Sequence, residues 1–278
     1  MAPLTLGLLG RTTAVDTAEH PIKFRTSRVQ ALLIYLTVEH ALGASDHRRE
    51  GLIDLFWPGL PEKSALQNLR QTIYQLKRNV PDFAPPDFNK GPIPLLLTDR
   101  QTIGLNPQFP LTADIFDFQR LQKGSVEGWA SAAELYRGPF LVDFSIADAE
   151  TFEEWANARR AYFHNEMMDT LNSLTIYHSN NRFYEEAARF ARRQIELDNL
   201  RERGYQQLMV ALTHSGRRSE ALAIFDDLER LLEQELSLEP NRETKEIRES
   251  IYADDLDVTT PQEHRLRGYQ LKEQIGAG

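Results

Sequence analysis

The chain has 278 residues, of which 41% are hydrophobic and 26% are charged. This length predicts about two domains, at roughly 100–200 residues each. The sequence has no cysteine, which excludes disulfides, thiolate metal sites and cysteine nucleophiles and fits a reducing compartment. The N-terminus lacks the pattern of a signal peptide, and no window approaches the roughly 18 apolar residues of a membrane helix. We therefore expect a soluble, cytoplasmic protein that does not enter a membrane.

The formal net charge of −9 is unevenly distributed. Residues 1–110 contain 12 Lys or Arg and 10 Asp or Glu, a net charge of +2, whereas residues 111–278 contain 20 and 31, a net charge of −11. This asymmetry predicts a first part that faces nucleic acid and an acidic second part. A net charge of +2 is modest, so the interpretation depends on where the basic residues lie.

Two short strands are predicted at the N-terminus, Leu4–Gly10 and Ile22–Phe24, on either side of a polar turn. A first helix is predicted after Thr26, which is suited to the N-cap position. Its apolar residues recur at helical spacing, and Gly43 ends it.

A second helix is predicted from His47 to Trp57, just before Pro58. Ser45 or Asp46 can cap its start.

The third predicted helix, within residues 63–81, combines an apolar stripe with a surface free of acidic side chains. Apolar residues recur every three or four positions, at Leu66, Leu69, Ile73, Leu76 and Val80. The segment holds four Lys or Arg and no Asp or Glu. Gln, Asn and Arg can form bidentate hydrogen bonds to base edges in a DNA major groove. We therefore predict a DNA-recognition helix whose contact residues are Gln67, Asn68, Arg70, Gln71, Tyr74, Gln75, Lys77 and Arg78.

Two short apolar runs, Leu95–Thr98 and Thr102–Leu105, predict a hairpin with Arg100 at its tip. Three helices followed by a hairpin is the order of a winged helix-turn-helix, an α+β fold that would occupy residues 1–110. In such a domain the third helix enters the major groove, and the hairpin touches the backbone or the minor groove, where Arg is favoured.

Four further arginines lie near the starts of the first two helices, where DNA phosphates are often bound. Each is either a phosphate contact or an ordinary surface charge, and the sequence leaves both interpretations open for Arg25, Arg28, Arg48 and Arg49. Of these, Arg28 and Arg48 are counted among the predicted DNA contacts.

Residues 111–255 are predicted to form an all-α domain, which makes the fold mainly α. The pair Glu186-Ala187 returns 34 residues later as Glu220-Ala221. This is the period of tetratricopeptide repeats, in which a small residue lets paired helices approach closely. The large aromatic residues of this part are expected in the core between helices, namely Trp129, Tyr136, Trp155 and Tyr205.

No motif in the sequence predicts catalysis or metal binding. The seven histidines show no HxxxH or HExxH spacing, and neighbouring carboxylates such as Glu153-Glu154 lie in charge-rich helical segments. We expect no enzyme activity, no cofactor and no metal.

Several segments, in the same order, resemble bacterial transcriptional activators of the SARP (AfsR/DnrI-like) type, namely TSRVQALLIYLTVE, LFWPGLPEKSALQNLRQTIYQLKRNV, ELYRGPFLVDF, FEEWANARRAYF and LDNLRERGYQQLMVALTHSG. The resemblance covers residues 4–252. It implies an OmpR-type winged helix joined to a bacterial transcriptional activation domain (BTAD). It also implies binding to direct repeats in promoters, a homodimer on DNA, and recruitment of RNA polymerase. By position, the third helix is the DNA-facing helix of the family, and Arg100 lies on its wing.

Residues 256–278 are predicted to be a linker and the start of another module. RGYQLKEQIGAG resembles the opening strand of a serine/threonine-kinase-type lobe. No catalytic lysine or aspartate motif follows, so no ATP binding is assigned to these residues.

The alternative function is a signalling scaffold in which the repeats bind a protein partner. The outward surface of residues 64–78 distinguishes the two hypotheses, because a DNA reader must avoid carboxylates beside phosphates and a scaffold need not.

Overall fold

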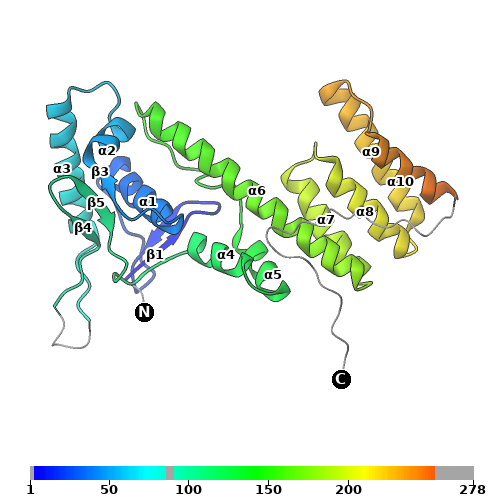
Figure 1. The fold of residues 1–278 in the computed structure, drawn as a ribbon, viewed down its shortest axis with the longest axis horizontal. Coiled ribbons are helices and arrows are strands. Elements are labelled where there is room, and N and C mark those ends of the chain that lie inside the picture. Colours follow the sequence, from blue (N-terminus) through cyan, green and yellow to red (C-terminus); the bar gives the residue numbers. More distant parts are fainter. Residues whose placement is uncertain (1–2, 86–90, 254–278) are drawn as a thin grey trace. The chain divides into compact units, whose positions relative to one another are not determined.

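The computed structural model describes residues 3–85 and 91–253 (Figure 1). They form two compact units that divide between residues 165 and 166, called unit 1 and unit 2, and each is treated by itself below. The predicted linker and kinase-like segment, residues 256–278, lies outside the described residues. Within these, no helix is both long enough and apolar enough to cross a membrane.

A three-stranded sheet in unit 1 joins the N-terminus to residues beyond position 110. β1 (Leu4–Gly7) pairs antiparallel with β2 (Thr13–Val15) and parallel with β6 (Leu111–Ala113). The prediction of a second strand at Ile22–Phe24 is wrong. There the chain forms no strand, although Pro21 makes an isolated bridge to Val15 and the backbone N–H of Ile22 donates to the carbonyl of Ala14 at 2.9 Å.

The carboxylate of Asp114 fixes this sheet to the helices that follow it. Asp114 begins α4 (Asp114–Gln122), is buried, and accepts hydrogen bonds from the backbone N–H of Leu8 at 2.9 Å and of Leu9 at 3.0 Å. Arg137 lies 3.3 Å from the same carboxylate. Burial raises the pKa of Asp114, and the two N–H donors oppose this shift. The compact unit therefore cannot end at residue 110.

Unit 1 also includes α5 (Val126–Leu135) and the first half of α6 (Glu150–Asn180). Glu39 on α1 accepts hydrogen bonds from Trp155 Nε1 at 2.8 Å and from Arg159 Nη2 at 2.6 Å, both on α6. These charge-assisted bonds, together with the sheet, join residues beyond position 110 to unit 1, which extends to residue 165.

The three predicted helices are present as α1 (Ser27–Ala41), α2 (Arg49–Phe56) and α3 (Glu62–Asn79). Thr26 occupies the N-cap position of α1 but makes no side-chain capping bond. The expected cap of α2 at Ser45 or Asp46 is wrong, because the next two residues form β3 (His47–Arg48) and Arg48 is the N-cap.

The predicted hairpin is confirmed as β4 (Leu96–Thr98) and β5 (Thr102–Leu105), which pair antiparallel. β3 adds to the other edge of β5, so this second sheet has the order β3-β5-β4. Together with α1, α2 and α3, it completes the winged helix-turn-helix. We call the β4–β5 hairpin the wing.

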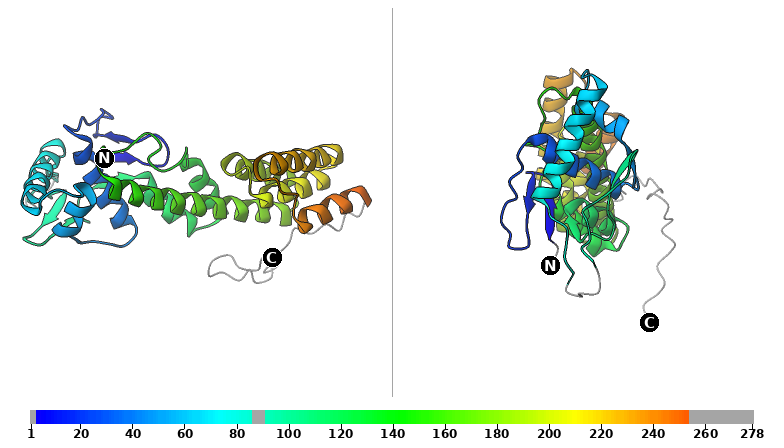
Figure 2. Two further views of the ribbon diagram at one scale, coloured as in Figure 1. Left: turned by 90° about the horizontal axis from the view of Figure 1, so that it is seen from above. Right: turned by 90° about the vertical axis from the view of Figure 1, so that its left-hand side faces the viewer.

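In the described part of unit 2, up to residue 253, four consecutive helices follow the second half of α6. They are α7 (Tyr184–Leu197), α8 (Glu202–His214), α9 (Arg218–Leu236) and α10 (Arg242–Ala253). α8 packs against α7, α9 and α10 (Figures 1 and 2). Ala187 and Ala221, the small residues of the 34-residue repeat, are both fully buried. Here the expected helical-repeat architecture is confirmed.

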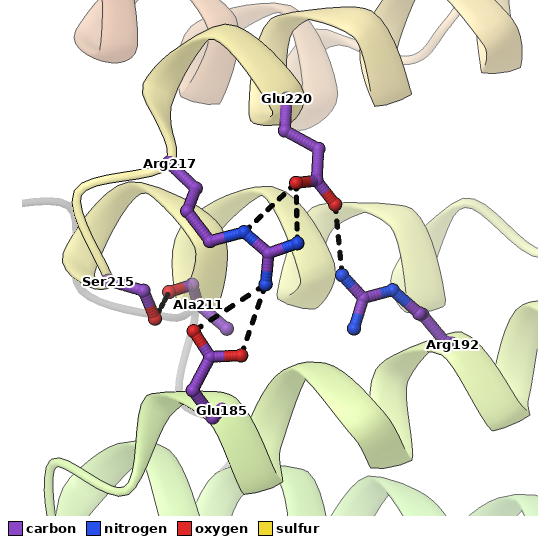
Figure 3. A network of polar contacts seen from close by, with 6 residues as sticks. All are labelled: Glu185, Arg192, Ala211, Ser215, Arg217 and Glu220. Carbon is purple, nitrogen blue, oxygen red and sulfur yellow. Dashed lines mark hydrogen bonds and ion pairs between the residues drawn. The ribbon is translucent and has the colours of Figure 1, made fainter.

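Two polar networks connect the helices of unit 2, and they differ in burial. Gln194 is buried, and its Nε2 donates to Thr175 Oγ1 at 3.0 Å and to Gln207 Oε1 at 2.8 Å. The other network is at the surface (Figure 3), where Arg217 bridges Glu185 and Glu220 while Arg192 donates to Glu220 at 3.0 Å. Water screens the surface network but not the buried one.

We expect Gln194→Leu to lower the free energy of unfolding by about 1–3 kcal/mol, because it leaves two buried polar partners without their donor. Arg217→Ala should have a smaller effect, and that effect should shrink as salt is added. Chemical denaturation at low and high salt measures both. Equal losses for the two variants would contradict this ranking.

Gly104→Ala should destabilise unit 1 by about 1–3 kcal/mol, the usual range for overpacking. A Cβ atom at position 104 would lie 2.1 Å from the carbonyl oxygen of Ser45, where β5 passes the chain that enters β3. Gly51→Ala is the matched control, since no atom lies within 4 Å of its added Cβ and alanine favours a helix. Thermal unfolding should show a loss for the first variant and no loss for the second.

Candidate nucleic-acid interface

α3 presents one apolar and one polar face, as the sequence predicts. Its buried residues pack against α1 and α2 and are Ala65, Leu69, Thr72, Ile73 and Leu76. Leu66, expected in this stripe, is only half-buried, and Thr72 lies in the core instead. The right-hand view of Figure 2 looks onto α3, drawn in cyan.

The opposite face of α3 carries the predicted contact residues. Six of them are exposed, namely Gln67, Arg70, Gln71, Tyr74, Lys77 and Arg78. The other two, Asn68 and Gln75, are half-buried. We call these eight residues the α3 face. The acidic residue of the helix, Glu62, lies in its first turn, where a negative charge favours the helix dipole.

The side chains of the α3 face are available to a ligand. None of these eight side chains makes a hydrogen bond or ion pair with another residue in the described ranges 3–85 and 91–253. The guanidinium of Arg78 lies 5.9 Å from the ring centre of Tyr74, one helical turn away. The face therefore offers several unused donors, three of them charged.

A shallow groove runs along the α3 face toward the start of α1. It is lined by Arg25, Thr26, Arg28, Val29, Trp57, Asn68, Gln71, Thr72 and Gln75. Polar side chains from two elements thus converge on one surface.

The four arginines near the helix starts divide into two pairs. Arg25 and Arg48 are exposed, and their side chains make no hydrogen bond or ion pair within the described part of the chain. Arg28 instead donates from Nε to the carbonyl of Phe56 at 3.0 Å and from Nη2 to that of Ala147 at 2.8 Å. Arg49 donates to the carbonyl of Asp99 at 2.8 Å. The guanidinium of Arg28 therefore helps to hold unit 1 together, and its predicted phosphate contact stays a prediction.

Arg100 is exposed at the tip of the wing, and its guanidinium is without a partner among the residues described. Asp99, beside it, binds the backbone of the wing turn. Over the same residues, no group of three His, Asp or Glu side chains could hold a metal ion.

We expect Arg28→Ala to lower the free energy of unfolding by about 1.5–3 kcal/mol, because it removes charge-assisted hydrogen bonds to backbone carbonyls. Arg25→Ala is the matched control and should leave stability unchanged. Denaturant titration of both variants measures the difference. An unaltered midpoint for Arg28→Ala would contradict the structural role.

Comparison with known proteins agrees with this arrangement. Residues 119–252 match the family of the bacterial transcriptional activator domain. Regulatory protein AfsR of Streptomyces griseus is 45% identical over 62 residues, which are 22% of this chain and 6% of AfsR.

A solved structure of Mycobacterium tuberculosis EmbR, in complex with a low affinity phosphopeptide, has the same fold with a TM-score of 0.67. The two chains are 18% identical, and the match covers 91% of this chain and 66% of the EmbR chain. The chain thus spans only part of both relatives. Together the findings agree with the resemblance to SARP-type transcriptional activators, and residues 119–252 match the bacterial transcriptional activator domain.

Proposed function

We propose that the chain is a sequence-specific DNA-binding transcriptional activator that reads bases with the α3 face. The comparisons point to a transcription regulator rather than an enzyme. The observation that carries the proposal is an exposed helix face of eight polar or aromatic residues, free of carboxylates, whose side chains have no hydrogen-bond or ion-pair partner among the described residues.

The chemistry of this face fits the major groove. Arg70 and Arg78 can each form a bidentate pair with guanine, and Gln67 and Gln71 can do so with adenine. Lys77 is a point charge suited to a phosphate. The apolar side of α3 is used by the core, so the helix can enter the groove without losing its packing.

Contacts outside α3 would fix the orientation of the domain. Arg25 and Arg48 are exposed cations near the starts of α1 and α2, where they can neutralise phosphates. Arg100 on the wing can reach the backbone or the minor groove. Phosphate contacts such as these position a protein but do not read sequence.

Unit 2 would act on other proteins rather than on DNA. Residues 166–278 contain 15 Lys or Arg and 22 Asp or Glu, a net charge of −7, which repels phosphates. We propose that the chain binds direct repeats in promoters as a dimer and that its helical repeats contact RNA polymerase. These two steps rest on the family resemblance and on the charge of this part.

Selection of bound duplexes from a random pool should yield a defined sequence that the chain binds with strong salt dependence. Arg70→Ala and Arg78→Ala should each cost about 1–3 kcal/mol in binding and relax the preference at one base pair, as expected for a guanine contact. Lys77→Ala should weaken binding uniformly and reduce the salt slope by about one.

Arg230 is an exposed arginine on α9, and Arg230→Ala is the control that should bind like the wild type. Unchanged affinity after replacing both Arg70 and Arg78 would refute the α3 face as the base-reading surface. Selection of no sequence at all would favour the scaffold hypothesis.

A further inference from the structure

We propose that Asp99 and Arg49 are positioning residues that hold the wing so that Arg100 reaches DNA. This inference rests on the proposed function, since it concerns how one of its contacts is presented. Asp99 is an acidic residue next to Arg100 in the sequence, and the guanidinium of Arg49 donates to a carbonyl of the wing.

The carboxylate of Asp99 is occupied by the turn that it begins. Its Oδ1 accepts the backbone N–H of Gln101 at 2.7 Å and of Thr102 at 2.6 Å, and its Oδ2 accepts the hydroxyl of Thr102 at 3.0 Å. The backbone N–H of Asp99 in turn donates to the carbonyl of Thr102 at 3.1 Å. Arg100 lies inside this closed loop of hydrogen bonds, so its backbone has little freedom.

Arg49 fastens the same turn to α2. Its backbone N–H donates to the carbonyl of Gln101 at 2.9 Å, and its Nη2 donates to the carbonyl of Asp99 at 2.8 Å. The two acceptors flank Arg100 directly. Pairing of Arg48 with Thr102, between β3 and β5, supports this attachment from the adjacent residue. Arg49, the first residue of α2, thus forms hydrogen bonds to the residues on both sides of Arg100 at the tip of the wing.

The two roles of Asp99, as a charge and as a brace, predict opposite effects on DNA binding. Hydrogen bonds from Thr102 and Gln101 lower the pKa of the Asp99 carboxyl, so it is ionised at neutral pH. If the charge alone mattered, removing it beside DNA phosphates would tighten binding. If the hydrogen bonds that Asp99 accepts within the turn matter, removing them loosens the turn that orders Arg100 and weakens binding.

The test measures affinity for the selected duplex with Asp99→Ala, Asp99→Asn, Arg100→Ala and the double variant Asp99→Ala/Arg100→Ala. Loss of the Arg100 contact should weaken binding about tenfold, as for one charge-assisted hydrogen bond. Asp99→Ala should weaken it by a similar factor, and the double variant should bind no more weakly than Arg100→Ala. Asp99→Asn keeps the Oδ1 acceptor and should bind at least as tightly as the wild type.

Arg49→Lys should weaken binding like Asp99→Ala although the charge is kept, because an ammonium cannot reproduce the guanidinium geometry. Arg230→Lys, at an exposed position on α9, is its matched control and should bind normally. In NMR spectra, the amide signals of Gln101 and Thr102 should shift in Asp99→Ala and stay near their wild-type positions in Asp99→Asn, while the signals of α3 stay unchanged in both.

Tighter binding by Asp99→Ala would overturn the inference, and so would losses that simply add in the double variant. Failure of the inference is separable from failure of the proposed function. If Arg70→Ala and Arg78→Ala weaken binding while the wing variants do not, only the positioning role falls. If none of these variants changes binding, the proposed DNA interface itself falls.

Discussion

The packing of α3 against α1 and α2 is the interaction on which the candidate interface depends. Leu69, Ile73 and Leu76 are buried beneath the helix, and full burial of each such side chain stabilises the fold by about 1.5–3 kcal/mol. Successive residues on a helix lie about 100° apart, so a rotation by one residue would expose leucines and bury Arg70. The core therefore fixes which side of α3 meets solvent. The α3 face points outward because the opposite side of the helix is packed in the core.

A second constraint decides how much of the chain belongs to unit 1. β1 pairs with β6, and the buried Asp114 carboxylate bonds to Leu8 and Leu9, more than 100 residues away in sequence. Glu39 is held by two side chains of α6. These long-range bonds extend the first unit past the charge boundary at residue 110. Net charge and compactness thus divide the chain at different places.

Local sequence patterns predicted the elements with strong periodicity or turn chemistry. The stripe of α3, the hairpin around Arg100 and the 34-residue repeat all have residues whose preferences agree with their neighbours. The predictions that were wrong have a common physical cause, because contacts between segments far apart in the sequence determine the structure there. β3 is two residues long and exists only through β5. Thr13–Val15 pairs with β1 where Ile22–Phe24 has the more apolar sequence. The sequence around Arg28 and Arg49 does not distinguish them from Arg25 and Arg48. Only the fold shows that the first two donate hydrogen bonds to backbone carbonyls.

The candidate site follows the same division. The eight residues of the α3 face could be predicted, since they lie opposite an apolar stripe. The positioning of Arg100 by Asp99 and Arg49 could not, since it joins residues 50 positions apart.

Photocrosslinking tests the role of the α3 face most directly. A benzophenone amino acid substituted for Gln71 would be irradiated on the selected duplex, with the same group at Glu229 on α9 as the control. Crosslinks from position 71 to bases within the selected sequence, and none from position 229, are the predicted result. Crosslinks from position 229 alone, or none to bases from position 71, would contradict base reading by α3.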